Sequence, residues 1–202
     1  MTTALSRRWF ERPASVVAPA LIGRHLVRRF PDGARCRVRI VETEAYEPGD
    51  AASHAFGGQT ARNATMFGPA GHLYVYLSYG IHHCLNVVTG RPGHGAAVLL
   101  RAAEPLENLA RLAQNRGVDD ERALCRGPGR LAQALAVDRS FDGIDLLGDG
   151  ALWIEPGTPV PRARLEATPR IGISVATDVA WRWVQAGSRW ATPTRRTAGA
   201  RR

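Results

Sequence analysis

Residues 72–88 read HLYVYLSYGIHHCLNVV, and this stretch predicts the core architecture of the chain. Apolar side chains alternate with others on both sides of residues 78–81, as expected for two antiparallel strands joined by a tight turn. Successive side chains of a strand point to opposite faces. On the first strand, one face carries Leu73, Val75 and Leu77, and the other carries Tyr74, Tyr76 and Ser78. The stretch therefore predicts a protruding hairpin with an aliphatic core face and an aromatic face.

The segments upstream of this hairpin predict a helix and a second pair of strands. Residues 14–22 (ASVVAPALI) favour a short helix before Gly23. Residues 24–30 and 35–46 flank Asp32-Gly33, a dipeptide typical of hairpin turns. Arginines at positions 35, 37 and 39 alternate with apolar residues, which indicates a half-exposed strand face. Residues 47–61 read as a loop, and Thr60 near its end is placed to cap a short helix through Met66.

The segments downstream complete an α+β pattern. Residues 95–105 predict a further buried strand, and residues 151–155 and 170–175 predict short strands. Residues 106–116 and 131–137 have helical spacing. We expect residues 1–193 to form one domain, in which helices surround a curved, mostly antiparallel sheet. Residues 194–202 predict a basic, disordered tail.

The composition excludes several classes of protein. The 202 residues are 45% hydrophobic and 22% charged, which is too apolar for a disordered chain. All 27 basic residues are arginine, so no lysine is present to form a Schiff base or to bind phosphate in a P-loop. Three cysteines without CxxC spacing do not indicate a disulfide framework or a cysteine-rich zinc site. With no secretory leader and no apolar run of membrane-spanning length, we expect a cytoplasmic protein.

The net charge of +9 indicates a polyanionic partner. Nucleic acid is favoured over an acidic membrane surface as that partner. Residues 1–40 and residues 161–202 each hold nine arginines and two acids, or +7, whereas residues 41–160 hold nine arginines and fourteen acids, or −5. Between Asp50 and Glu104, 53 residues contain no acid but hold five of the six histidines and three of the four tyrosines. Such a stretch is typical of a surface that faces phosphate or of buried strands, and both can hold together.

The densest group of reactive side chains lies in residues 41–46, VETEAY. In a strand, Glu42, Glu44 and Tyr46 point the same way, with neighbouring Cα atoms of the two acids about 7 Å apart. Three interpretations of the two acids are open. They form an acid/base pair of the kind that cleaves glycosidic bonds, or one is catalytic and the other structural, or both are solvated acids on an edge strand. A general base beside an aromatic ring would activate water while the ring stacks a planar substrate.

Three further features leave more than one interpretation open. Tyr79, at the hairpin tip, is either a ring that wedges into a base stack or a ring folded back on its own hairpin. His82 and His83 are adjacent in a strand and point to opposite faces, so they cannot both bind one metal ion. This arrangement disfavours a metal hydrolase built on the histidines. Residues 127–130 (GPGR) precede a helix and are either a turn or a phosphate site that includes Arg130.

Taken in chain order, these motifs resemble a known family. Residues 41–88, VETEAYEPGDAASHAFGGQTARNATMFGPAGHLYVYLSYGIHHCLNVV, are similar to the core of the alkyladenine (3-methyladenine) DNA glycosylase family. LLRAAEPL, LCRGPGRLAQALAVDRSFDGIDL and RIGISV followed by GSRW continue the resemblance across residues 9–191. It implies a formyltransferase C-terminal-domain-like fold.

The resemblance also implies an activity. The family releases damaged purines from double-stranded DNA, among them 3-methyladenine, 7-methylguanine, hypoxanthine and ethenoadenine, as the first step of base-excision repair. It is monofunctional, so water is the nucleophile, and it uses no metal or organic cofactor. The absence of lysine fits this chemistry, with the N-terminal amine as a formal alternative nucleophile. We expect a monomer associated with the nucleoid.

The resemblance assigns roles to individual residues. Glu44 would be the general base that activates the attacking water, and Arg101 would hold that water against it. Asn86 would exclude the amino group of normal guanine, and Tyr79 would fill the gap left in the DNA stack. The flipped base would stack on Tyr46, His54 and Tyr76, and DNA backbone contacts would come from Thr60, Arg62 and Arg130. A non-catalytic nucleic-acid binder that uses the arginine-rich ends is the competing hypothesis.

Overall fold

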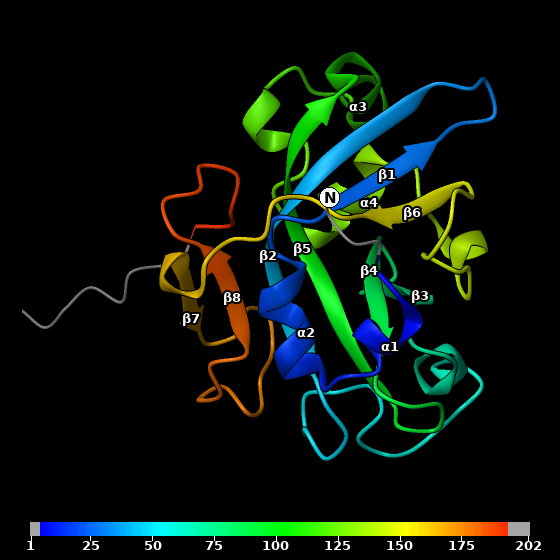
Figure 1. Ribbon diagram of the computed structural model, residues 1–202, viewed down its shortest axis with the longest axis vertical. Coiled ribbons are helices and arrows are strands. Elements are labelled where there is room, and N and C mark those ends of the chain that lie inside the picture. Colours follow the sequence, from blue (N-terminus) through cyan, green and yellow to red (C-terminus); the bar gives the residue numbers. More distant parts are fainter. Residues whose placement is uncertain (1–4, 194–202) are drawn as a thin grey trace, which may run out of the picture.

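The structure is a computed structural model that describes residues 5–193. Residues 1–4 and 194–202 lie outside the described residues, and so does the basic tail predicted for 194–202. In the described part, eight strands form one antiparallel sheet with helices around it (Figure 1). The α+β class predicted from the sequence is therefore confirmed.

The central strand of the sheet is β2. The strands are β1 (His25–Arg29), β2 (Arg35–Tyr46), β3 (Leu73–Ser78), β4 (His82–Thr89), β5 (Ala96–Glu107), β6 (Leu152–Glu155), β7 (Leu165–Thr168) and β8 (Arg182–Gln185). Their order is β3-β4-β5-β2-β1-β6, and β8 pairs with both β2 and β7. One edge of β2 pairs with β5, whereas its other edge pairs with β1 at residues 35–39 and with β8 at residues 42–44. Shifts in the β2–β5 register at residues 40–43 fit the curvature of the sheet, because such irregularities bend a strand.

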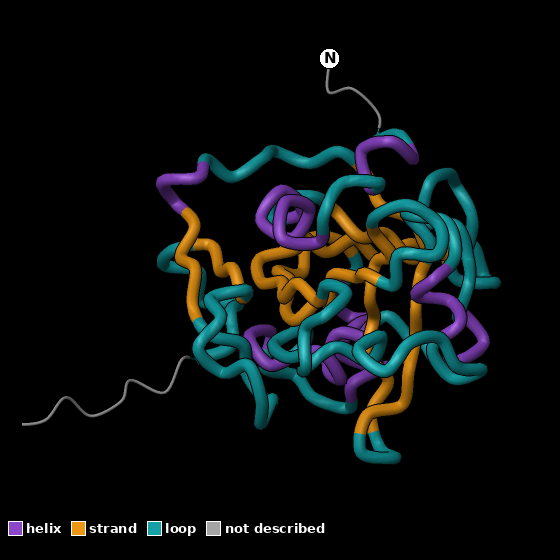
Figure 2. The backbone as a smooth tube through the Cα atoms, turned by 90° about the horizontal axis from the view of Figure 1, so that it is seen from below, coloured by secondary structure: helices purple, strands orange, loops and turns teal. Residues whose placement is uncertain are grey.

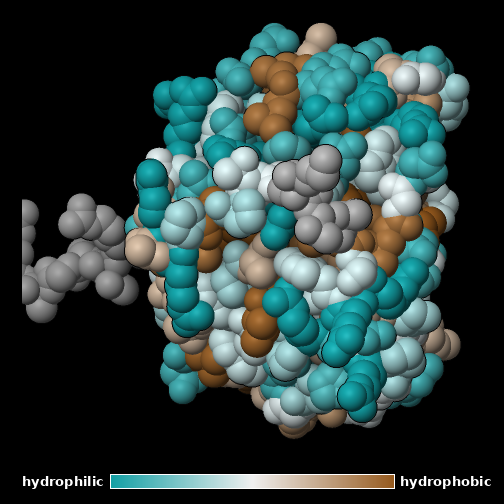
Figure 3. All heavy atoms as spheres, in the orientation of Figure 1, coloured by the Kyte–Doolittle hydropathy of each residue, from teal (hydrophilic) through white to brown (hydrophobic). Residues whose placement is uncertain are grey.

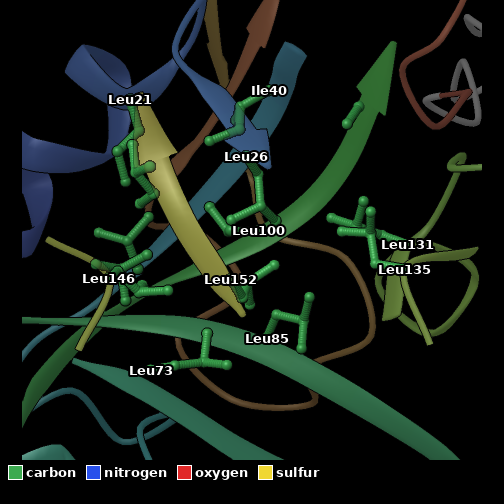
Figure 4. Packing of buried hydrophobic residues seen from close by; sticks show 14 of the residues in the cluster. Leu21, Leu26, Ile40, Leu73, Leu85, Leu100, Leu131, Leu135, Leu146 and Leu152 are labelled. Carbon is green, nitrogen blue, oxygen red and sulfur yellow. The ribbon is translucent and has the colours of Figure 1, made fainter. Parts of the chain in front are cut away.

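The main hydrophobic core lies between the sheet and its helices. The α-helices are α1 (Arg7–Phe10), α2 (Ala14–Leu21), α3 (Leu109–Arg116) and α4 (Pro128–Ala134), and the 3-10 helices are η1 (Ala64–Phe67), η2 (Glu121–Ala123), η3 (Arg139–Phe141) and η4 (Arg162–Arg164). Helix α2 packs on β2 and β5, and α4 packs on β4, β5 and α3. Leucines from these elements interdigitate in the core, including Leu21, Leu26, Leu85, Leu100 and Leu131 (Figure 4). Burial of this apolar surface is the main stabilising contribution to the fold.

The predicted hairpin is formed by β3 and β4, and it projects beyond the body of the molecule (Figure 2). Leu73 and Val75 are buried in the main core, as predicted. Leu77 is 40% exposed, so the prediction that it belongs to the core face is wrong. The reason is that the hairpin has left the core by residue 77. On the opposite face of β3, Tyr74 is buried in a second, smaller cluster.

Several local predictions upstream and in the middle of the chain are confirmed. Residues 14–21 form helix α2, and the strand pair β1–β2 turns through Gly33 at a φ of +81°. The arginines at 35, 37 and 39 are half-buried, and the residues between them are buried. Helices α3 and α4 form where helical spacing predicted them, but they begin at Leu109 and Pro128 rather than at residues 106 and 131.

Two local predictions are wrong. Residues 170–175 are not a strand but an irregular segment in which Gly172 has a φ of +81°, and strands β7 and β8 form on either side of it. Thr60 does not cap a helix, because the helix begins at Ala64. Instead, the backbone nitrogen and hydroxyl of Thr60 donate to Oδ1 of Asn63, at 2.6 and 3.0 Å.

The exposed surface mixes polar and apolar groups. On the face shown in Figure 3, hydrophilic residues predominate and hydrophobic residues form small, separate groups. None of the helices within residues 5–193 is long and apolar enough to cross a membrane.

Candidate active site

A cavity of about 560 Å³ lies beside the aromatic face of β3 and β4, between the end of β2 and residues 171–175. This volume suits one planar heterocycle with its attached groups. The structure brings seven of the predicted site residues to the lining of this cavity: Tyr46, His54, Arg62, Tyr76, Tyr79, Asn86 and Arg101. Residues that are far apart in the sequence therefore converge on one site.

The aromatic side of the cavity is built from rings that contact one another. The centroids of Tyr74 and Tyr76 lie 5.7 Å apart in a stacked arrangement, and His54 meets Tyr76 edge to face at 4.4 Å. Nδ1 of His54 lies 3.1 Å from the hydroxyl of Tyr74. Because His54 and Tyr76 touch, a base that stacks between these two rings requires them to separate. The arrangement offers planar apolar surfaces with polar edges.

The rings of the cavity are neutral at neutral pH. Burial raises the pKa of Tyr74 to about 12, and it also raises the pKa of Tyr76. Burial, together with the positive charge of Arg62, lowers the pKa of His54 below its ordinary value of 6.5. A cationic ligand therefore meets no protonated histidine here.

Glu44 lies directly behind the lining of the cavity. It is completely buried on β2, so the interpretation of a solvated acid on an edge strand is wrong. Its Oε2 accepts a hydrogen bond from the Tyr46 hydroxyl at 2.8 Å. Its Oε1 accepts from the backbone nitrogen of Ile171 at 2.8 Å and lies 3.2 Å from Nη1 of Arg101. All three donors belong to residues that line the cavity, so a water molecule would reach Glu44 by passing between them.

Glu42 is also completely buried, but it lies deeper in the protein. Its Oε1 accepts hydrogen bonds from Nε of Arg101 at 2.9 Å and from Nε of Arg182 at 2.7 Å. Its Oε2 accepts from the backbone nitrogen of Thr192 at 2.7 Å. Arg182 and Thr192 are not among the residues that line the cavity. The two acids therefore differ in position: one is next to the cavity, and the other is surrounded by protein.

The two acids and the two arginines form a group that we call the ion cluster: Glu42, Glu44, Arg101 and Arg182. Its charges cancel, as buried charges generally require. Arg101 bridges the two carboxylates and reaches the cavity. Burial opposes the charge on Arg101, but the facing Glu44 and Glu42 raise its pKa above the ordinary value of 12.5. Arg101 is therefore a fixed positive charge beside Glu44.

Tyr46 is held from behind by a second buried ion pair. The guanidinium of Arg170 lies 4.7 Å from the centroid of the Tyr46 ring. Arg170 donates to Oδ1 of Asp50 at 2.9 Å and to the backbone oxygen of Ala45 at 3.0 Å. Burial and the facing charge of Glu44 raise the pKa of Tyr46, so its hydroxyl stays a hydrogen-bond donor to Glu44.

Tyr79 is 86% exposed at the turn between β3 and β4, with a φ of +50°. The interpretation that its ring folds back on its own hairpin is therefore wrong. Leu77 and Ile81 are 40% and 71% exposed next to it. We call Leu77, Tyr79 and Ile81 the hairpin tip. Contiguous exposed apolar groups are typical of surfaces that contact a partner.

Asn86 is buried on β4, opposite Tyr74. Its Nδ2 donates to the backbone oxygens of Tyr74 at 3.2 Å and Cys84 at 3.3 Å. These bonds fix the amide at the lining of the cavity, where it limits the shape of a ligand.

The three residues predicted to contact the DNA backbone lie on the surface. Arg62 is exposed and lines the cavity, and Thr60 is exposed two residues before it. Arg130 is exposed on α4, and it does not line the cavity, although Pro128 of the same helix does. Only Arg62 of the three therefore lies at the cavity itself.

Histidines do not gather into a metal site in the part of the chain that the structure describes. Within residues 5–193, no group of three or more histidine, cysteine, aspartate or glutamate side chains is arranged to hold a metal ion. His82 is exposed and lies against Gly129, where an added Cβ would be 2.8 Å from the Cβ of His82.

Sequence reasoning missed Arg170, Arg182 and the role of residues 171–175. Arg182 lies 140 residues from its partner Glu42, and Arg170 lies 120 residues from Asp50, so no local spacing connects them. Residues 170–175 carry a signal, because RIGISV is part of the family resemblance, but the sequence predicts a strand there.

Comparisons with known proteins agree with the resemblance seen in the sequence. The model of the methylpurine-DNA glycosylase family matches residues 8–189. A protein of Chlorobaculum parvum is 45% identical over 179 residues, which cover 88% of this chain and 85% of the relative. A protein of Streptomyces avermitilis is 49% identical over 177 residues (85% and 82%), and one of Burkholderia lata is 47% identical over 190 residues (92% and 89%). All three relatives are provisionally named 3-methyladenine DNA glycosylase.

Proposed function

The chain belongs to the methylpurine-DNA glycosylase family, and from this premise we propose that it is a monofunctional DNA glycosylase of base-excision repair. It flips damaged purines out of double-stranded DNA and hydrolyses the N-glycosidic bond with a water molecule activated by Glu44. The product is an abasic site in the DNA.

One observation carries this proposal: the buried Glu44–Arg101 pair lies behind an aromatic cavity of about 560 Å³. A base must leave the duplex before water can reach C1′, and such a cavity receives an extruded base. Flipping costs a few kcal/mol, and less for a damaged base that pairs or stacks poorly. The exposed ring of Tyr79 supports this step, since it is placed to fill the gap in the stack.

The chemical step needs a base and a means of stabilising positive charge on the sugar. The oxygen of the attacking water bonds to C1′ as the C1′–N bond breaks, and Glu44 accepts one proton of that water. The sugar develops oxocarbenium character, which the Glu44 carboxylate stabilises electrostatically. Arg101 holds the water against Glu44. Because the chain contains no lysine, no lysine amine competes with water at C1′.

Selection of damaged purines depends on the cavity. Alkylated purines are cationic, so they are good leaving groups and are attracted to the faces of aromatic rings such as Tyr46 and Tyr76. A neutral purine such as hypoxanthine needs a proton on the leaving base. The buried amide of Asn86 excludes the amino group of normal guanine.

The test is incubation of the protein with duplexes that contain hypoxanthine, ethenoadenine or 7-methylguanine, scored for abasic sites. Wild-type protein should release at least one of these bases, and Glu44→Gln should release none at a measurable rate while still binding the damaged duplex. Tight binding without base release by the wild type would instead support a non-catalytic binder. Base release by Glu44→Gln at the wild-type rate would exclude Glu44 as the general base.

A further inference from the structure

We propose that Glu42 is a positioning residue for base release: it holds Arg101 against Glu44 and balances the charge of the ion cluster. Glu42 touches neither water nor substrate in this role. The inference rests on the proposed function, because it assigns the second carboxylate of the VETEAY motif within the same reaction.

The contacts of Glu42 exclude it as a proton-transfer group. The described bonds engage both of its oxygens: Oε1 accepts from Arg101 and Arg182, and Oε2 accepts from the backbone of Thr192. The side chain has no exposed surface, and it does not line the cavity. A general base must lie within hydrogen-bond reach of the proton that it accepts, and these contacts keep Glu42 from that position.

Arg101 transmits the position of Glu42 to the cavity. Its Nε lies 2.9 Å from Glu42, and its Nη1 lies 3.2 Å from Glu44. The guanidinium group is planar and rigid, so a bond that fixes Nε also fixes the direction of Nη1. The distance between Arg101 and Glu44 is therefore set from the far side by Glu42.

Glu42 also sets the charge that surrounds Glu44. Removal of its charge leaves Arg101 and Arg182 facing a single carboxylate in a buried site. The charged and titratable groups that face Glu44 from the elements packed around it are Glu42 and Tyr46 on β2, Tyr76 on β3, Cys84 on β4, Arg101 on β5, Arg182 on β8 and Arg170 in the segment before Ile171. With Glu42 neutral, the cationic members of this group favour ionised Glu44, which becomes a weaker base.

The experiment compares Glu42→Gln with the wild type on a lesion that the wild type releases. The single-turnover rate of base release should fall at least tenfold at neutral pH, and the acid limb of the pH–rate profile should move to lower pH. The dissociation constant for damaged duplex should stay within twofold, because Glu42 is completely buried and does not line the cavity. A rate and a pH profile equal to those of the wild type would overturn the proposal.

A second variant separates charge from position. Glu42→Asp keeps the charge but withdraws the carboxylate from Arg101, so the rate should fall while the acid limb stays in place. A purely structural role predicts lower stability for both variants with no shift of the acid limb in either, and that result would also overturn the proposal. If Glu42→Gln does not fold, folded Glu42→Asp decides alone. An unchanged rate contradicts the proposal, and a reduced rate with an unchanged dissociation constant for damaged duplex supports it.

The control is Glu166→Gln, which neutralises an exposed carboxylate on β7, next to β8. Its rate and pH profile should match those of the wild type. Failure of the wild type to release any base would count against the proposed function, whereas activity of the wild type with an unaffected Glu42→Gln variant would count only against this inference.

Discussion

The ion cluster and the hairpin tip are opposites in composition and in burial. In the ion cluster, four charged residues are at most 6% exposed, whereas at the hairpin tip three residues with large apolar groups are 40–86% exposed. Proteins usually place charges outside and large apolar groups inside, because an unpaired buried charge and an exposed apolar cluster both have unfavourable solvation. The buried charges and the exposed apolar groups both border the same cavity, because Arg101 and Tyr79 line it.

The difference between the two regions lies in what satisfies them. The charges of the ion cluster are satisfied within the protein, by hydrogen bonds that join β2, β5 and β8. The apolar groups of the hairpin tip have no such partner in the described residues, and the proposed function supplies one, the stacked bases of DNA. Substitutions in the ion cluster should therefore change folding, and substitutions at the tip should change only DNA binding.

The largest expected effect is that of Arg182→Met, which removes one partner of the ion cluster. An uncompensated buried charge at Glu42 should lower the free energy of unfolding by about 3–5 kcal/mol. Urea unfolding followed by circular dichroism measures this change. The control is Arg164→Met, at an exposed arginine of the neighbouring η4, which should change stability by less than about 0.5 kcal/mol. Equal losses in the two variants would mean that the buried charges contribute no more than surface charges.

An intermediate effect is expected for Tyr79→Ala at the hairpin tip. Loss of one stacking ring should weaken the preference for damaged over undamaged duplex by about tenfold, or ~1.4 kcal/mol. The free energy of unfolding should not change, because the ring is 86% exposed. Competition binding with matched duplexes measures the preference, and Tyr79→Phe should retain it because the ring remains. Wild-type discrimination by the alanine variant would remove the tip from the binding model.

The smallest effect is expected at His54, which lines the cavity that both regions reach. Its lowered pKa means that the folded protein binds fewer protons than the unfolded chain, so this stabilising contribution is present above pH 6.5 and is lost as the pH falls below it. Arg62→Ala removes one of the two causes and should raise the pKa of His54, with little change in stability. An NMR titration of the imidazole protons measures the pKa directly. No shift in Arg62→Ala would mean that burial alone controls His54.

The sequence predicted the parts of the molecule that depend on local patterns. The alternation in residues 72–88, the turn at Asp32-Gly33 and the buried run in residues 95–105 all predicted strands that the structure contains. Seven of the predicted site residues line one cavity because they belong to these strands, to the turn between β3 and β4, or to the loop that follows β2. Their proposed roles stay predictions until the variants are measured.

The parts that sequence reasoning missed depend on long-range contacts. Residues 170–175 alternate like a strand, but Pro169 precedes them and the backbone of Ile171 donates to Glu44 rather than to a neighbouring strand. One interpretation of the sequence makes Glu42 a solvated acid. It is wrong because Glu42 is paired with Arg182, and local spacing does not reveal this partner 140 residues away. No periodicity within a single segment carries information of this kind.

The bond between Thr192 and Glu42, which spans 150 residues, also has a consequence for biosynthesis. A nascent chain that has been made only as far as residue 180 contains Glu42, Glu44 and Arg101, but it lacks both Arg182 and Thr192. Its carboxylates then outnumber their buried partners, so the ion cluster is complete only when the last part of the described chain has been translated. Chains emerge from the N-terminus at about 5–20 residues per second, and contacts of high sequence separation form last. Under the proposed function, an incomplete translation product should therefore release no bases from DNA.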